Sequence, residues 1–270
     1  MRSLLPLAAI LALAAAPAAP AETPSQTDNA PPAASGKAPP APVKATAEQR
    51  AEAERLDPLA RAAFWARQVQ IDPKDGQAEV GLSRALRELG RFDEAAAAAD
   101  QLLVFDPNNY DALLESARAR VAADQGFYAI ENAQKAEALQ PHDWRPVSLL
   151  AVALEQASRD DEALAAHQKA LALAPDNPAT LTNLGMYYAT HGDTAKAEPL
   201  LRKAATAPTA SAQERQNLAL VLGLEGKFDE AERLERQDLP PDQVDNNLAY
   251  LHSDAQPIQP RSWESLKTVQ

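Results

Sequence analysis

The feature that most constrains this chain is an internal repeat with a fixed period. The hexapeptide Gly90–Ala95 (GRFDEA) returns as Gly226–Ala231 (GKFDEA), and the offset of 136 is four times 34. At a spacing of 34, two series of positions carry only small residues and a third carries proline. The series are Ala95, Ala129, Ala163, Ala197 and Ala231; Ser83, Ala117, Ala151, Gly185 and Ala219; and Pro73, Pro107, Pro141 and Pro175. Such a period indicates a stack of equivalent units that bury a shared core.

The composition favours helices as the elements of those units. Hydrophobic residues make up 46% of the chain and aromatic residues only 5%, and there is no cysteine. Alanine has the best helix propensity and lets helices approach closely, whereas sheets favour branched and aromatic side chains. The net charge of −12 also argues against nucleic acid as a partner.

One repeat contains two helical segments joined by a glycine turn. From Gly76, apolar residues recur at roughly helical spacing as far as Leu89, and Gly90 ends the first segment. The second segment runs from Asp93 to Val104, and its first carboxylates complement the positive end of the helix dipole. The Asp106–Pro107 step then breaks the helix. The sequence therefore predicts an all-α fold of antiparallel helix pairs.

The repeats resemble the tetratricopeptide repeat. The best match is the unit that contains Asn183, Leu184, Gly185, Tyr188, Gly192, Ala197 and Ala204. The resemblance implies an α-solenoid with five repeats over residues 76–238, a degenerate N-terminal helical cap over residues 47–75 and a C-terminal cap helix over residues 239–252. Pro199 is an exception inside a predicted second helix, and we expect it near the end of the first turn, where a missing N–H costs least.

The N-terminal residues indicate export. Residues 1–21 read as a secretory signal peptide, because the apolar run at residues 4–16 is shorter than the ~20 residues that span a bilayer. We expect cleavage after Ala21 and a periplasmic protein; the alternative is an uncleaved anchor. Residues 22–46, rich in proline and alanine, are predicted to form a disordered linker, and residues 253–270 a disordered tail.

A solenoid of this kind presents an extended concave surface, where we expect function to reside. By resemblance, its N-terminal part is basic and its C-terminal part is apolar and interrupted by two asparagines. The basic residues are Arg84, Arg87, Arg118 and Arg145; the apolar residues are Val152, Met186, Leu220 and Leu224; and the asparagines are Asn183 and Asn217. Guanidinium groups could bind carboxylates of a partner, and in peptide-binding members of the family an asparagine at this position holds the ligand backbone. Structural alternatives stay open: the arginines pair with Glu88 or Glu115, and the asparagines bond neighbouring helices.

The tail and the histidines complete the candidate sites. Trp263 and Leu266 are spaced to form one helical turn that docks in a groove, either on a partner or on this chain; the alternative is a tail that folds nonspecifically against the cap. The histidines have no metal-ligand spacing, and there is no nucleophile elbow or phosphate-binding glycine loop. We therefore expect no catalytic residue, no metal and no cofactor.

The last repeat carries a more specific resemblance. Residues Asn217–Ala231, followed by Asp238–Pro240 and Asn247–Leu251, resemble the C-terminal end of TadD-type proteins of the Flp pilus (tight adherence) assembly system. The resemblance implies a non-enzymatic assembly scaffold in the cell envelope, with the pilus secretin or other Tad components as candidate partners. Many such proteins are lipidated through a cysteine that this chain lacks. The alternatives are a generic periplasmic adaptor of envelope or division complexes, and a hydrolase of envelope polymers.

Overall fold

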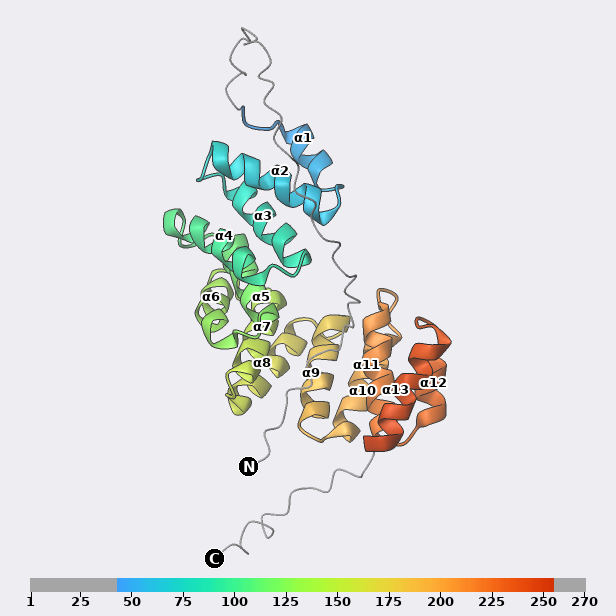
Figure 1. Cartoon of the computed structure of the whole chain (residues 1–270). Helices are drawn as coiled ribbons and strands as arrows, with labels where there is room; N and C mark the ends of the chain where they lie inside the picture. Colours follow the sequence, from blue (N-terminus) through green and yellow to red (C-terminus); the bar gives the residue numbers. More distant parts are fainter. Residues whose placement is uncertain (1–42, 255–270) are drawn as a thin grey trace, which may run out of the picture. The chain divides into compact units, whose positions relative to one another are not determined.

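The computed structural model describes residues 43–254, and all regular structure in this range is helical (Figure 1). The helices are α1 (Ala47–Ala53), α2 (Pro58–Ile71), α3 (Gly76–Glu88), α4 (Phe92–Phe105), α5 (Tyr110–Ala122), α6 (Gly126–Leu139), α7 (Trp144–Gln156), α8 (Asp160–Leu173), α9 (Pro178–Thr190), α10 (Thr194–Ala205), α11 (Ala212–Leu224), α12 (Phe228–Glu235) and α13 (Pro241–Asp254). The predicted signal peptide, the linker as far as residue 42 and the tail from residue 255 lie outside the described residues. None of the helices in the described range is long and apolar enough to cross a membrane.

The repeat period sets where the helices begin. The first helices of the five pairs start at Gly76, Tyr110, Trp144, Pro178 and Ala212, and each has 13 residues. The second helices, from α4 to α12, start on the same spacing. Each helix packs against the next along the chain, and first helices of adjacent pairs also touch. The predicted all-α solenoid of antiparallel helix pairs is confirmed.

Local signals explain these boundaries. Each first helix follows a residue whose side chain accepts a hydrogen bond from a backbone N–H of the first turn, which satisfies a donor that the helix cannot pair internally. These capping residues are Asp75, Asn109, Asp143, Asn177 and Ser211. Each turn inside a pair contains one residue with positive φ. Glycine takes this place at 90, 192 and 226, whereas Asp124 and Ser158 adopt the same conformation at some energetic cost.

The small residues lie where paired helices cross. All five alanines from Ala95 to Ala231 have 0% exposure. The two series of small residues meet directly, since the Ser83 hydroxyl donates a hydrogen bond to the carbonyl oxygen of Ala95 at 2.7 Å. A buried cluster continues from Ala117 through Leu150 to Leu184, so that successive pairs share one core.

Pro199 lies deeper in its helix than expected. Because α10 begins at Thr194, Pro199 falls in the second turn rather than at the end of the first, and the expected position was wrong. The Asp193 side chain accepts a hydrogen bond from the backbone N–H of Lys196 and so caps the start of α10, five residues before Pro199.

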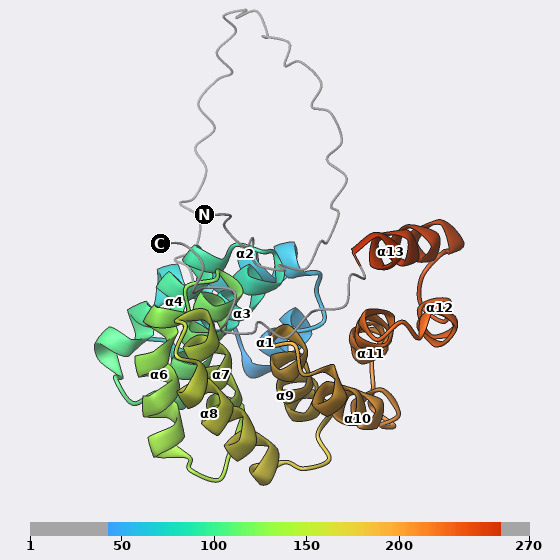
Figure 2. The same cartoon turned by 90° about the horizontal axis from the view of Figure 1, so that it is seen from below.

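Both ends of the repeat array are covered by helices outside the five pairs. At the N-terminal end, the fully buried Trp65 of α2 fills the space left by Gly81 of α3. At the other end, α13 packs against α11 and α12 (Figure 2), with Leu251 seated over Gly223. A Cβ atom on either glycine would overlap the ring or the leucine.

A carboxyl group is buried near the first of these contacts. Glu79 of α3 is 1% exposed, and its Oε1 has no hydrogen-bond partner among the described residues. Burial raises its pKa to about 7, and the neighbouring Asp75 carboxylate contributes to that rise.

Replacing Gly81 with alanine should destabilise the fold. Alanine is the better helix former, but its methyl carbon would lie 2.6 Å from Cε2 of the rigid Trp65, and overpacking costs about 1–3 kcal/mol. Urea unfolding measures the change. Gly76→Ala is the matched control, since its Cβ would approach no closer than 3.4 Å to the flexible Leu102. Equal effects of the two substitutions would contradict the assigned packing.

Replacing Glu79 with glutamine should stabilise the fold at high pH. The folded-state pKa of about 7 exceeds the ordinary value of 4.5, so the stability of the parent chain falls as pH rises between these values. Glu79→Gln removes this loss, and its advantage should grow by about 2–3 kcal/mol between pH 4 and pH 8. Urea titrations across this range give the two curves, and parallel curves would contradict the raised pKa.

Candidate functional site

The predicted groove residues all lie on the first helices. Arg84 and Arg87 lie on α3 and Arg118 on α5; Arg145 and Val152 lie on α7; Asn183 and Met186 lie on α9; Asn217, Leu220 and Leu224 lie on α11. We call the surface formed by α3, α5, α7, α9 and α11 the first-helix face. Trp263 and Leu266 lie outside the described residues.

Three of the four arginines converge on one buried carboxylate. Glu115 of α5 is 1% exposed. Its Oε1 lies 2.6 Å from Nη1 of Arg118 and 3.6 Å from Nε of Arg84, and its Oε2 lies 3.1 Å from Nε of Arg87. Of the two pairing alternatives, Glu115 is the acid that these arginines use, because Glu88 is bound by Arg61 of α2.

This cluster carries more positive than negative charge. Among the described residues, Glu115 is the only acid that forms an ion pair with Arg84, Arg87 or Arg118. Burial alone would raise the pKa of Glu115, but the three guanidinium groups outweigh it and hold that pKa below its usual value. The arginine side chains remain 28–42% exposed, so two unneutralised positive charges face solvent.

Arg145 is separate from this cluster. It forms an ion pair with Asp143 at 2.5 Å and lies over the ring of Tyr110, 5.7 Å from its centroid. The Tyr110 hydroxyl donates to the same carboxylate at 2.6 Å. The Arg145 guanidinium lowers the pKa of Asp143 to about 2, while burial and that hydrogen bond raise the pKa of Tyr110 to about 12. Arg145 is therefore held at the start of α7.

The two asparagines differ in their contacts. Asn183 donates to the hydroxyl of Ser148 at 2.8 Å and so connects α9 to α7, as the structural alternative proposes. Asn217 is the equivalent residue of the next repeat, and Thr182 is the equivalent of Ser148. Within residues 43–254, Asn217 makes no side-chain hydrogen bond and the buried Oγ1 of Thr182 has no partner. Thr182 was missed in the sequence, although its place one repeat period after Ser148 identifies it.

The apolar residues are only partly available. Val152, Met186 and Leu220 are half-buried, and Met186 packs against the core cluster of α11. Leu224 is the most exposed member at 40%. Free apolar surface on the first-helix face therefore increases toward the end of α11.

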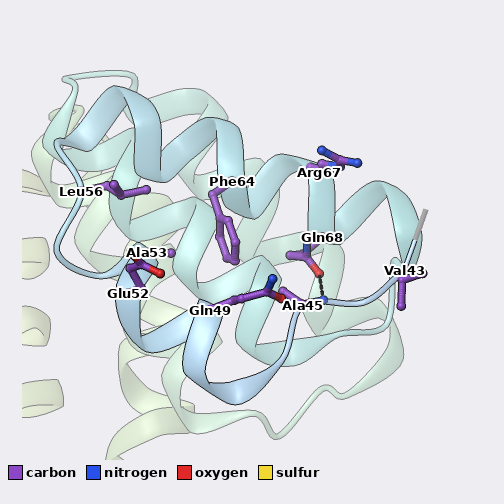
Figure 3. A pocket seen from close by; sticks show the side chains of 9 residues that line it. All are labelled: Val43, Ala45, Gln49, Glu52, Ala53, Leu56, Phe64, Arg67 and Gln68. Carbon is purple, nitrogen blue, oxygen red and sulfur yellow. Dashed lines mark hydrogen bonds between the residues drawn. The ribbon is translucent and has the colours of Figure 1, made fainter. Parts of the chain in front are cut away.

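A small cavity lies at the N-terminal cap, where the sequence predicted no site (Figure 3). It has a volume of about 360 Å³ and is lined mainly by α1 and α2, with Leu56 and Phe64 as its largest apolar side chains. The Gln68 side chain accepts a hydrogen bond from the backbone N–H of Ala45 at 2.7 Å and so closes one side. The described residues contain no group of three or more acidic, histidine or cysteine side chains suited to a metal ion.

Comparisons with known proteins agree with this architecture. Residues 146–210 match the family model of the tetratricopeptide repeat. None of the curated proteins compared with the chain matches it.

Solved structures show the same fold. A thermophilic tetratricopeptide-repeat protein of Thermus thermophilus is 23% identical with a TM-score of 0.58, over 66% of this chain and 99% of that chain. A tetratricopeptide-repeat protein of Parabacteroides merdae is 13% identical with a TM-score of 0.62, over 76% of this chain and 80% of that chain. The MamA protein of Desulfovibrio magneticus is 21% identical with a TM-score of 0.52, over 58% of this chain and 89% of that chain. These similarities show a tetratricopeptide-repeat solenoid.

Removing the charge of Glu115 should destabilise the fold. Glu115→Gln leaves three neighbouring guanidinium groups without an anion, and breaking a buried ion pair costs about 3 kcal/mol. Urea unfolding at neutral pH measures the loss, which should shrink in acid as the carboxylate of the parent chain is protonated. Glu162→Gln, which removes an exposed acid paired with Arg159, is the control and should change stability little. Equal effects would mean that Glu115 does not hold the cluster together.

Proposed function

We propose that this chain is a non-enzymatic scaffold that binds a segment of a partner protein on its first-helix face. The observation that carries this proposal is the cluster in which Arg84, Arg87 and Arg118 share the single buried carboxylate of Glu115. Proteins with the tetratricopeptide-repeat fold bind protein partners, and this cluster supplies a positive site on a chain whose net charge is −12.

The chemistry of the face defines the partner segment. Two uncompensated guanidinium charges at α3 and α5 suit acidic side chains, because arginine binds carboxylates with paired hydrogen bonds. Toward α11, the exposed Leu224 suits apolar side chains, and the half-buried Asn217, which makes no side-chain hydrogen bond within residues 43–254, suits a peptide backbone. A segment with acidic residues at one end and apolar residues at the other matches both parts.

The cellular setting of the proposal comes from the sequence. The predicted signal peptide supports export to the periplasm, and the resemblance to TadD-type proteins supports a role in assembling the Flp pilus or its secretion apparatus, with the secretin as candidate partner. A generic periplasmic adaptor of envelope complexes uses the same face, and the identity of the partner separates the two. No observation on the described residues supports a hydrolase.

Site-specific photocrosslinking in cells tests the proposal. A photoreactive residue at position 220 on α11 should capture one partner protein reproducibly, whereas the same residue at the exposed position 161 on α8 should not. A pilus or secretion component would support the assembly role, and a different envelope protein would support the generic adaptor. Equal capture from both positions would contradict a binding role for the first-helix face.

Replacing Arg84 with glutamine should weaken capture of that partner. Arg84 is the most exposed arginine of the cluster and lies farthest from Glu115, so its loss disturbs the fold least. We expect the Kd for the purified partner to rise about tenfold and its salt dependence to decrease, because one solvent-facing charge is lost. Arg91→Gln, which removes an exposed arginine on the turn before α4, is the control. An unchanged Kd would exclude the cluster from the binding site.

A further inference from the structure

Two aromatic side chains are exposed at the start of α6. Phe127 is 71% exposed and Tyr128 is 63% exposed, and their rings meet edge to face with centroids 5.5 Å apart. They lie on a second helix, so they do not belong to the first-helix face. Aromatic side chains are costly to leave in water and are enriched at protein interfaces.

The repeat shows that these residues are not required by the fold. The equivalent positions of three other repeats, 93–94, 161–162 and 229–230, all hold Asp-Glu, which favours the positive end of the helix dipole. In contrast, α6 has no acidic residue in its first turn. The remaining second helix, α10, also departs from the pattern, but with Ala195 and Lys196 rather than aromatic residues. Among the five second helices, only α6 carries aromatic residues at these two positions, where acidic residues would stabilise the helix. This indicates that the rings have a role other than stabilising α6.

The Tyr128 ring borders a groove between α4 and α6. The groove has a volume of about 400 Å³, and Val104, 73% exposed, lies on its α4 side. Beneath Tyr128, Arg120 lies 5.8 Å from the ring centroid and pairs with Asp100. The polar groups in the groove bond to one another, because Ser116 donates to Asp100 at 2.6 Å and accepts from Asn132 at 2.9 Å. The groove therefore offers an occupant the exposed apolar surfaces of Val104 and Tyr128, with Glu131 as an acidic side chain at its edge.

Two carboxylates lie near the start of α6. Asp93 accepts a hydrogen bond from the Gln125 amide at 2.8 Å, and Asp124 occupies the turn before α6. Neither carboxylate forms an ion pair with a cation within residues 43–254. We call Asp93, Val104, Asp124, Phe127 and Tyr128 the α4/α6 patch. It suits a large apolar side chain flanked by basic residues.

One segment of this chain has that chemistry. Trp263 lies between Arg261 and Lys267, with Leu266 nearby, in the range that the structure does not describe; with Glu264, residues 261–267 carry a net charge of +1. Residues 22–42 contain no aromatic, leucine or isoleucine residue and cannot supply such an anchor. The first-helix face suits Trp263 less well, because its arginine cluster is positive and its apolar residues are mostly half-buried.

The short chain between α13 and Trp263 favours binding of Trp263 from a second copy of the protein. The described range ends at Asp254 of α13, which packs on the last pair, whereas the patch lies on the first two pairs. Eight residues lie between Asp254 and Trp263, and the nine steps from one to the other span at most about 30 Å when fully extended. Helices pack about 10 Å apart, so reaching back over three pairs would demand a fully stretched chain. The Trp263 residue of a neighbouring copy can reach the patch without this limit on chain length.

We propose that residues 261–267 of one copy bind the α4/α6 patch of another, with Trp263 inserted between α4 and α6. The contact joins two different surfaces, so it is a heterologous interaction that links copies in a row. This contact involves neither the arginine cluster nor the apolar end of the first-helix face. A partner segment bound to the first-helix face would therefore leave the α4/α6 patch accessible.

A synthetic peptide of residues 257–270 tests the proposed contact. The receptor is the full chain carrying Trp263→Ala, which removes competition from its own segment. By fluorescence anisotropy, the labelled peptide should bind, and Trp263→Ala in the peptide should raise the Kd about tenfold or more. The receptor double variant Phe127→Asp/Tyr128→Glu should weaken binding equally. This variant restores the Asp-Glu of the other repeats, so it should fold, and circular dichroism checks this.

The charge change in that variant distinguishes specific from nonspecific binding. It makes the receptor more negative, so nonspecific attraction of the basic peptide would increase rather than fall. Leu220→Asp on α11 is the matched control for binding to the first-helix face. No binding, or binding sensitive to Leu220→Asp but not to the double variant, would overturn the proposal.

Sedimentation of the full chain tests delivery by a second copy. The parent chain should self-associate as its concentration rises, and either Trp263→Ala or the double variant should abolish the association. The parent chain could instead stay monomeric and fail to bind the peptide, while the Trp263→Ala chain binds it. This result would show that Trp263 binds the patch of its own copy, and it would overturn binding by a neighbouring copy. Because Arg84→Gln should leave self-association unchanged, this proposal and the proposed function can fail independently.

Discussion

The close crossing of paired helices is the constraint on which the rest of the structure depends. At each crossing an alanine has no exposed surface, and Ala95 lies against Ser83 and Ala197 against Gly185 of the partner helix. Larger side chains would push the helices apart and shift every later pair, because each unit is positioned only by its neighbours. The chain therefore keeps small residues at these places, while the outward-facing positions vary freely.

The buried carboxyl groups of Glu115 and Glu79 have pKa values shifted in opposite directions. Glu115 is compensated by three guanidinium groups, which lower its pKa and in turn are held by it in one place. Glu79 forms no ion pair with a cation in the part of the chain that the structure describes, and burial raises its pKa. The first carboxylate organises a surface with surplus positive charge, whereas the second lowers the stability of the fold as pH rises from about 4.5 to about 7.

Much of the fold follows from the sequence because the period, the turn glycines and the capping residues all act locally. The repeat period gives the start of α10 at Thr194, but Pro199 was expected near the end of the first turn and lies in the second. The site was less predictable. The spacing placed the arginines on the correct helices, but not their convergence on Glu115, which requires the packing of α3 on α5. The rings at Phe127 and Tyr128 could have been found from the broken Asp-Glu series.

The uniform distance between helix starts limits how such a protein can diversify. The five pairs contain no inserted loop, since both series of helices keep one constant interval from each start to the next. One additional residue within a helix would rotate everything that follows it by about 100° relative to what precedes it. One additional residue in a turn would also shift all subsequent helices relative to the preceding ones. A new binding specificity must therefore arise from substitutions of surface side chains at fixed backbone positions, or from duplication of a whole repeat.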